Sequence, residues 1–291
     1  MTAAHTALHA PSGLSDLTRH YDVLLSDVWG VIHNGRESFP AACAALARWR
    51  AERGPVILIS NSPRPSHDVV AQLDALGVPR NSWSAFVTSG DATRLLLAER
   101  APGPAWRLGP DRDAPLYEGL GLSFESLDKA AFIACTGPID DETEGPGDYQ
   151  DRFEGAARRG LEMVCANPDI VVQRGDKLIY CGGALAQLYE TLGGKVVMAG
   201  KPHAPIYDLC VAEAERLTGA PVPRERMLCI GDGVATDVKG ANAQGLDVMF
   251  VAGGIHGAET VGPDGLDVAA AAALLAKEGA HARWAMAALS W

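Results

Sequence analysis

A carboxylate follows an apolar run near the amino terminus of the chain. Residues 22–28 are typical of a strand, and Asp27 lies close to its end, just before a turn that contains Gly30. In open α/β folds, the carboxyl ends of the strands form the edge of the sheet where ligands bind. A carboxylate at that edge can attack phosphorus or carbon and form a covalent intermediate. Asp27 is therefore a candidate nucleophile.

Two further carboxylates follow a second apolar run, residues 227–230. Asp232 comes directly after this run and its glycine, and Asp237 follows five residues later. If the two strands are neighbours in one sheet, Asp27 and Asp232 converge at its carboxyl edge. Magnesium prefers a few protein oxygens together with substrate phosphate. We therefore predict a Mg²⁺ site that includes these carboxylates, with Asp237 holding a metal-bound water or orienting Lys201.

Polar groups suited to phosphate follow a third apolar run, residues 56–59. Ser60 and Asn61 offer a hydroxyl and an amide to phosphate oxygens. Lys201, in the tripeptide Gly-Lys-Pro, offers a positive charge for the nucleophile and a transferring phosphoryl group. The sequence thus predicts phosphoryl chemistry with Asp27, Ser60 and Lys201 as catalytic residues.

Strand and helix patterns alternate over the first hundred residues and return near residue 196. This βα rhythm favours a doubly wound parallel sheet. The expected strands are residues 22–28, 56–59, 86–88, 227–230 and 248–251, and the expected helices include residues 39–53, 206–217 and 268–277.

The composition changes at an Ala-Pro-Gly-Pro stretch, residues 101–104. The segment after it has strand patterns of its own at residues 131–135, 161–165 and 177–180. We therefore predict a discontinuous core domain of residues 1–100 and 196–291. Residues 101–195 are predicted to form an inserted α/β domain.

The overall composition excludes several classes of protein. The 291 residues carry a formal net charge of −11, which argues against non-specific binding to nucleic acid or an anionic membrane. No stretch approaches the roughly 20 apolar residues of a membrane span. Residues 1–13 lack the basic start and apolar core of a secretory signal. The six cysteines have no paired CxxC spacing, so we expect buried thiols in a cytoplasmic protein and no zinc site.

The ordered set of motifs resembles the haloacid dehalogenase (HAD) superfamily, and more closely its class IIA branch of small-molecule phosphatases. In this resemblance Asp27 matches the nucleophile, Ser60 the second motif and Lys201 the third. Asp232 and Asp237 match the acidic fourth motif. The implied activity is that of a Mg²⁺-dependent hydrolase that forms an aspartyl phosphate on Asp27. The implied fold is a Rossmann-like core with an inserted α/β cap.

The resemblance extends to the segments expected to bind substrate. The tripeptide Ser60-Asn61-Ser62 matches the second motif of this branch, and residues 167–169 and 182–184 are similar to its cap. It implies that Asn61, Ser62, Asp169 and Gly183 bind substrate or phosphate. The implied partner is a small phosphorylated metabolite, and the resemblance also suggests a homodimer paired through the cap.

One position departs from the family pattern. Phosphatases of this family carry a second aspartate two residues after the nucleophile, which protonates the leaving group and later activates water. This chain has Trp29 there. The backbone carbonyl of Trp29 can still coordinate Mg²⁺, but the usual proton carrier is missing. General acid–base catalysis contributes about 10²–10⁴-fold to rate.

Three hypotheses follow from this departure. The first is a phosphatase that uses a substitute proton donor (His33, His203 or His256) or substrates with good leaving groups. The second is another HAD reaction, such as carbon–phosphorus cleavage. The third is a phosphometabolite-binding or regulatory protein with little turnover. The indole of Trp29 could stack on a flat substrate, but packing is the role we favour.

Overall fold

The computed structural model describes residues 7–174 and 177–291. Contacts divide the chain into two compact units, which we describe separately. The first comprises the described residues up to Ser60, with Ala71–Phe86 and Tyr207–Trp291. The second comprises Asn61–Val70 and Val87–Ile206. The predicted division into a core of 1–100 and 196–291 and an inserted domain of 101–195 stays a prediction.

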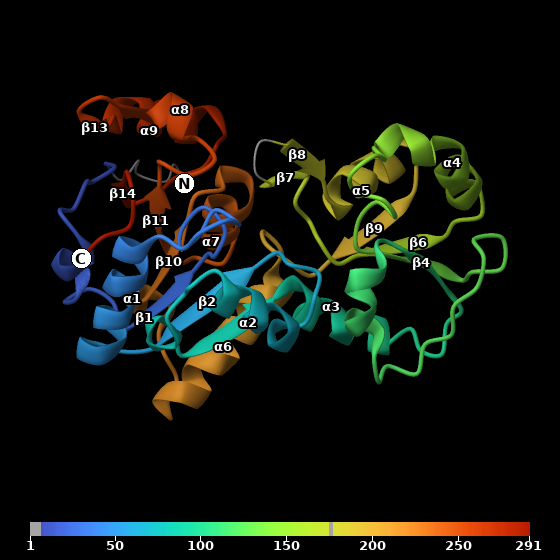
Figure 1. Ribbon diagram of the computed structural model, residues 1–291, viewed down its shortest axis with the longest axis horizontal. Coiled ribbons are helices and arrows are strands. Elements are labelled where there is room, and N and C mark those ends of the chain that lie inside the picture. Colours follow the sequence, from blue (N-terminus) through green and yellow to red (C-terminus); the bar gives the residue numbers. More distant parts are fainter. Residues whose placement is uncertain (1–6, 175–176) are drawn as a thin grey trace. The chain divides into compact units, whose positions relative to one another are not determined.

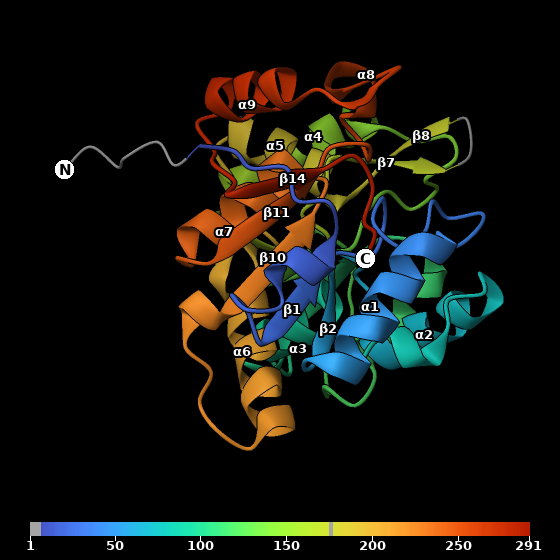
Figure 2. The ribbon, with the colours of Figure 1, turned by 90° about the vertical axis from the view of Figure 1, so that its left-hand side faces the viewer.

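A parallel sheet is the centre of the first unit. Its strand order is β14-β11-β10-β1-β2-β3, and β1 runs parallel to both β2 and β10. The strands are β1 (Val23–Ser26), β2 (Val56–Ser60), β3 (Ala85–Thr88), β10 (Met227–Gly231), β11 (Asp247–Val251) and β14 (Trp284–Met286). Figure 2 shows α1 (Pro40–Glu52) and α7 (Lys239–Ala243) on opposite sides of β1 and β10. The prediction of a doubly wound parallel sheet is confirmed.

The central strands are buried along their whole length. Every residue of β1 and of β10 is buried, which explains why their sequences are continuous apolar runs without alternation. Helix α1 starts with Pro40 at its first turn, where proline's missing N–H costs no helical hydrogen bond. Its Trp49 is fully buried.

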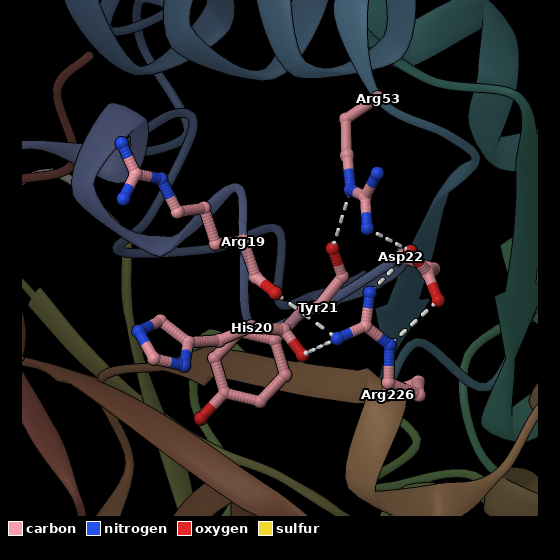
Figure 3. Close-up of polar contacts among 6 residues, drawn as sticks. All are labelled: Arg19, His20, Tyr21, Asp22, Arg53 and Arg226. Atoms are coloured by element: carbon pink, nitrogen blue, oxygen red, sulfur yellow. Dashed lines mark hydrogen bonds and ion pairs between the residues drawn. The ribbon is translucent and has the colours of Figure 1, made fainter.

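An ion cluster ties together the amino ends of these strands (Figure 3). The Asp22 carboxylate accepts hydrogen bonds from Arg226 at 2.7 Å and from Arg53. Arg226 also donates to the backbone carbonyls of Arg19 and His20 at 3.1 and 2.7 Å. The hydrogen bonds from Arg226 lower the pKa of Asp22. The cluster therefore joins the start of β1, the end of α1 and the start of β10, at the edge of the sheet away from Asp27.

The second unit contains a four-stranded sheet of its own, in the order β4-β5-β6-β9 with parallel pairings. The strands are β4 (Ala105–Leu108), β5 (Phe132–Cys135), β6 (Glu162–Cys165) and β9 (Lys195–Met198). Helices α4 (Gln150–Arg158) and α5 (Gly182–Thr191) pack on it, and β7 (Val171–Arg174) pairs with β8 (Lys177–Tyr180) as an antiparallel hairpin (Figure 1). Phe153 contacts the rings of Tyr149 and Tyr189 at centroid distances of 5.7 and 5.3 Å. These aromatic side chains are fully buried and form the centre of this core.

The remaining helices are α2 (Ser66–Ala75), α3 (Ser89–Ala98), α6 (Ala204–Thr218), α8 (Gly257–Thr260) and α9 (Val268–Lys277). Two short strands, β12 (Val261–Gly262) and β13 (Gly265–Leu266), pair in antiparallel fashion between α8 and α9. The helices predicted at 39–53, 206–217 and 268–277 are confirmed as α1, α6 and α9, within two residues at each end. Strands β4, β7, β12, β13 and β14 were not predicted. All six cysteines are buried, as expected. Within the described part of the chain, no helix has the length and apolar character needed to cross a membrane.

Candidate active site

Three buried carboxylates meet at the carboxyl edge of the first unit's sheet. Each of Asp27, Asp232 and Asp237 offers an oxygen, and these oxygens all lie within 4.8 Å of one another. Their residues are 7, 7 and 4% exposed. Asp27 follows β1 and Asp232 follows β10, and the two strands pair in parallel with Ser26 opposite Ile230. The two strands were predicted to be neighbours in one sheet, and their pairing explains why Asp27 and Asp232 lie close together.

Glycines allow the backbone to close around Asp232. A β-carbon at Gly30 or at Gly254 would overlap the Asp232 carboxylate. Gly30 also has a φ of +82°, a left-handed conformation that favours glycine. The backbone N–H of Ile255 donates to Asp232 Oδ2 at 2.8 Å. Two loops, one after β1 and one after β11, therefore hold Asp232 in place.

Asp237 is held by the turn that follows β10. Its Oδ2 accepts a hydrogen bond from the backbone N–H of Gly233 at 3.0 Å, and its own N–H donates to the Gly233 carbonyl at 2.8 Å. A β-carbon at Gly231 would overlap the Asp237 side chain. A single π-helical turn, Val234–Val238, carries the residue. Turns of this type are frequent at functional sites.

The acidic cluster fits a divalent cation. Three carboxylates this close repel one another, and burial makes an uncompensated charge costly. Carboxylate oxygens are the ligands that Mg²⁺ and Ca²⁺ prefer. The donor set of Asp27, Asp232 and Asp237 therefore suits a hard divalent metal ion.

Trp29 packs within its own loop. A β-carbon at Gly35 would overlap the Trp29 indole, and Gly35 has a φ of +83°. The Trp29 and His33 rings meet edge to face, with centroids 5.2 Å apart. The indole thus lies over Gly35 and beside His33, which supports the packing role that we favoured.

His33 is a neutral acceptor in the same loop. Its Nδ1 accepts the backbone N–H of Gly35 at 3.0 Å, so the neutral ring carries its proton on Nε2. The residue is 3% exposed, and burial lowers its pKa to about 4. A ring that is neutral near pH 7 is a poor proton donor. Burial also lowers the pKa of His203 and of His256.

The second unit places Asn61, Lys201 and Asp169 together. The Asn61 amide accepts the Lys201 backbone N–H at 2.7 Å and donates to the Lys201 carbonyl at 3.0 Å. It also donates to Asp169 Oδ1 at 2.8 Å. Asn61 and Lys201 are buried, at 4 and 3% exposure. The predicted contact of Asn61 with phosphate stays a prediction, and it would require one of these hydrogen bonds to be exchanged.

The other predicted site residues lie at the end of β2, just after it, and at the start of α5. Ser60 ends β2 and is half-buried, and the Ser62 hydroxyl accepts the Arg64 backbone N–H at 3.4 Å. Gly183 lies in the first turn of α5, where its N–H donates to the Asp169 carbonyl at 3.0 Å. A β-carbon at Gly183 would lie 2.6 Å from that carbonyl oxygen. Gly183 therefore permits close packing against Asp169, and its contact with substrate stays a prediction.

Sequence reasoning missed the loop that holds Asp232. The pair Gly253-Gly254 before Ile255 was the available signal, because adjacent glycines often mark a close backbone approach. The double hydrogen bond between Asn61 and Lys201 left no local signal, because the two residues are 140 positions apart.

Comparisons with known proteins show the family to which this fold and these motifs belong. Residues 24–123 match the family model described as haloacid dehalogenase-like hydrolase. Residues 198–275 match a second model, described as HAD-hydrolase-like. Together the two matches include Asp27, Ser60, Lys201, Asp232 and Asp237.

Three relatives are informative. The crystal structure of a haloacid dehalogenase-like hydrolase from Brucella suis 1330 is 46% identical, with a TM-score of 0.86, and the match covers 96% of this chain and 99% of that one. A glycerol phosphate phosphatase from Mycobacterium tuberculosis, solved in complex with calcium, is 27% identical with a TM-score of 0.61, covering 82% and 68% of the two chains. The 5′-nucleotidase YutF of Bacillus subtilis is 25% identical over 239 residues, or 81% of this chain and 88% of YutF. This chain therefore belongs to the haloacid dehalogenase-like hydrolase family, in its class IIA phosphatase-like branch.

Proposed function

We propose that this protein is a Mg²⁺-dependent hydrolase of a small phosphorylated metabolite. The observation that carries the proposal is the buried cluster of Asp27, Asp232 and Asp237 at the carboxyl edge of the sheet. The cluster combines a candidate nucleophile with two carboxylates that could hold a metal ion beside it. The calcium complex of the glycerol phosphate phosphatase supports a divalent ion in this family.

In this proposal Asp27 is the nucleophile. One of its carboxylate oxygens bonds to phosphorus while the bond from phosphorus to the leaving-group oxygen breaks, which gives an aspartyl phosphate. A water oxygen then bonds to phosphorus and the bond to Asp27 breaks, releasing inorganic phosphate and a proton. Ser60 donates to a phosphoryl oxygen and Lys201 offsets its negative charge. Mg²⁺, held by the three aspartates and the backbone carbonyl of Trp29, would supply further positive charge at the phosphoryl oxygens.

The proposal includes a preference for good leaving groups. At position 29 an indole takes the place of an acid, and the neighbouring His33 has a pKa of about 4 and is neutral near pH 7. Departure of an alkoxide without a proton is slow, whereas the carboxylate of an acyl phosphate or the phenolate of an activated aryl phosphate leaves as a stable anion. Acyl and activated phosphates are therefore the class we expect to react fastest.

The substrate itself is a small phosphorylated molecule in this proposal. The two named relatives act on different compounds, a glycerol phosphate and a 5′-nucleotide, so they support the class without selecting one member. We propose that residues 101–195 act as the cap, with Asp169 and Gly183 facing the leaving group and Asn61 and Ser62 near the phosphate. A cytoplasmic homodimer paired through this cap completes the proposal.

The test is phosphate release from a panel of phosphorylated metabolites, acyl phosphates and aryl phosphates, with Mg²⁺ or with EDTA. We expect release that requires Mg²⁺ and that is lost in Asp27→Asn. Asp16→Asn is a matched control, because Asp16 is an exposed residue in the 3₁₀ turn before β1. Release that continues in Asp27→Asn would contradict the proposed nucleophile.

A second candidate function is ligand binding with little turnover. Trp29 favours it, because the residue in the place of the usual acid is an indole that packs against Gly35 and His33. Mg²⁺-dependent protection by phosphorylated ligands against heat, equal in Asp27→Asn and without phosphate release, would support this candidate over the hydrolase.

A further inference from the structure

The side chain of Asn61 is fully engaged in hydrogen bonds. A primary amide has two N–H donors and one carbonyl acceptor. One donor of Asn61 bonds to Asp169 Oδ1 at 2.8 Å, and the other bonds to the Lys201 carbonyl at 3.0 Å. The amide oxygen accepts the Lys201 backbone N–H at 2.7 Å. One buried side chain therefore joins the backbone of Lys201 to the carboxylate of Asp169.

The chemistry of the partners fixes the orientation of the amide. The Lys201 N–H can only donate, so the amide oxygen must face it. The Asp169 carboxylate accepts, so the amide nitrogen must face that side. If the amide were rotated by 180°, its N–H groups would face the Lys201 N–H, and its oxygen would face the Lys201 carbonyl and the Asp169 carboxylate.

The surrounding backbone leaves little room for the amide to move. A β-carbon at Gly200 would lie 2.7 Å from Asn61 Oδ1 and 2.5 Å from Ser89 Oγ. Lys201 itself is 3% exposed. A side chain at residue 200 would force Asn61 and Ser89 to shift, whereas glycine lets the backbone that carries Lys201 lie directly against the amide.

Asp169 is held on its other side by α5. Its backbone N–H donates to Asn167 Oδ1 at 3.1 Å, and its carbonyl accepts the Gly183 N–H at 3.0 Å. The hydrogen bonds thus run without interruption from Lys201, through Asn61 and Asp169, to the first turn of α5. A shift of the Asn61 amide would alter both the Lys201 backbone and the Asp169 carboxylate.

We propose that Asn61 is a positioning residue, an inference that rests on the proposed function. It sets the main-chain position of Lys201, from which the ammonium group reaches the transferring phosphoryl group. It also sets the direction of the Asp169 carboxylate. The Lys201 ammonium, which stabilises the transferring phosphoryl group, and the Asp169 carboxylate, which contacts the leaving group, therefore both depend on the Asn61 amide. Its role is therefore distinct from a direct contact with phosphate.

The experiment measures kcat and KM with p-nitrophenyl phosphate and the inhibition constant of inorganic phosphate. The variants are Asn61→Ala, Asn61→Asp, Asp169→Asn, and the pair Asn61→Asp with Asp169→Asn. Asn242→Ala is the matched control, because Asn242 holds the backbone of His281 in the same way, donating at 2.8 Å and accepting at 3.0 Å, in the first unit.

We expect Asn61→Ala to lower kcat by about 10²-fold, the loss that a displacement of about 1 Å in a catalytic group can cause. Inhibition by inorganic phosphate should weaken at the same time, while Asn242→Ala keeps both values. Asn61→Asp sets a carboxylate against Asp169 and should be as poor as Asn61→Ala. Adding Asp169→Asn restores a donor and acceptor pair between residues 61 and 169, while the Lys201 carbonyl still lacks its donor. The lost kcat should therefore recover in part, which a purely structural defect would not allow.

Two results overturn the inference. One is Asn61→Ala with kcat and phosphate inhibition of the wild type, and the other is the absence of recovery in the double variant that combines Asn61→Asp with Asp169→Asn. If Asn61→Ala does not fold, the double variant decides. If the wild type releases no phosphate, the proposed function fails, and protection by inorganic phosphate against thermal unfolding replaces kcat. The positioning role is then supported if inorganic phosphate no longer protects Asn61→Asp against thermal unfolding but protects the double variant of Asn61→Asp with Asp169→Asn. Equal protection of all variants refutes it.

Discussion

Gly254 lies so close to Asp232 that a β-carbon at residue 254 would overlap the carboxylate. The next N–H along the chain, that of Ile255, donates to the same carboxylate at 2.8 Å. The loop after β11 therefore holds one carboxylate of the acidic cluster in place, although it contributes no carboxylate itself. The close approach explains why this loop needs a glycine at residue 254.

Gly254→Ala is expected to displace Asp232 and to weaken Mg²⁺-dependent phosphate release by about 10²-fold, because a catalytic group moved by about 1 Å can cost that much. Gly257→Ala, at the start of α8 three residues later, is the control, since the nearest atom to a β-carbon there is the Ala252 carbonyl oxygen at 4.0 Å. The measurement is kcat as a function of Mg²⁺ concentration. Equal values for the two variants would show that the close packing around Asp232 has no part in activity.

Trp29→Asp is expected to raise phosphate release from alkyl phosphates by about 10²–10⁴-fold, since it restores an acid two residues after the nucleophile. The gain should be smaller for aryl phosphates, whose leaving groups need no proton. Trp29→Asn is the matched control, because asparagine has the same shape as aspartate and no acid. A gain that is the same in both variants would mean that removing the indole, rather than adding a proton carrier, is what matters.

Gly35→Ala is expected to destabilise the protein through two effects. A residue with a β-carbon costs about 1–2 kcal/mol in the left-handed region, and the added carbon would also overlap the Trp29 indole. Gly121→Ala separates the two, because Gly121 has a φ of +68° and nothing within 4 Å of a β-carbon. The thermal midpoint should fall further for Gly35→Ala than for Gly121→Ala, and the difference should shrink in a Trp29→Ala background.

His33 is expected to make the folded state less stable as the pH falls. Burial lowers its pKa from 6.5 to about 4, so below pH 6.5 the unfolded chain binds a proton that the folded protein does not. Stability from this residue is complete above pH 6.5 and is lost progressively down to about pH 4. The shift corresponds to about 3 kcal/mol at most.

His33→Gln provides the comparison, because the glutamine oxygen can still accept the Gly35 N–H. We expect the free energy of unfolding to fall less steeply between pH 6.5 and pH 4 in this variant than in the wild type. Urea unfolding at several pH values measures the slope. Identical slopes would indicate that His33 titrates normally in the folded protein.

The position of the acidic cluster could be predicted from the sequence because two of its three aspartates, Asp27 and Asp232, follow strands that are apolar almost throughout. Such strands are buried on both faces, which places them in the centre of a parallel sheet where their ends must be close. Strands β4 and β14 were missed for the opposite reason. In β4, Trp106 and Arg107 are only half-buried, and β14 has three residues. Segments this short, or with such a mixture of polar and apolar residues, show no clear periodicity of apolar positions.

The surroundings of the site residues could not be predicted in the same way. The role of Asn61 depends on contacts with Asp169 and Lys201, which lie 108 and 140 positions away in the sequence. The orientation of Trp29 depends on the left-handed conformation of Gly35, six residues later. Patterns in a single sequence indicate which side chains end a strand, whereas these contacts depend on how distant turns pack.

The most direct test of the central claim is the mass of the protein after rapid acid quenching of its reaction with p-nitrophenyl phosphate and Mg²⁺. Because an indole at residue 29 stands where the family has the acid that later activates water, we expect the second step to be slow and the phosphorylated form to accumulate. We predict one added phosphoryl group, mapped to the peptide that contains Asp27, and none in Asp27→Asn or with EDTA. Phosphate release at a steady rate, with no added mass at Asp27 at any quench time and no effect of Asp27→Asn, would contradict the account.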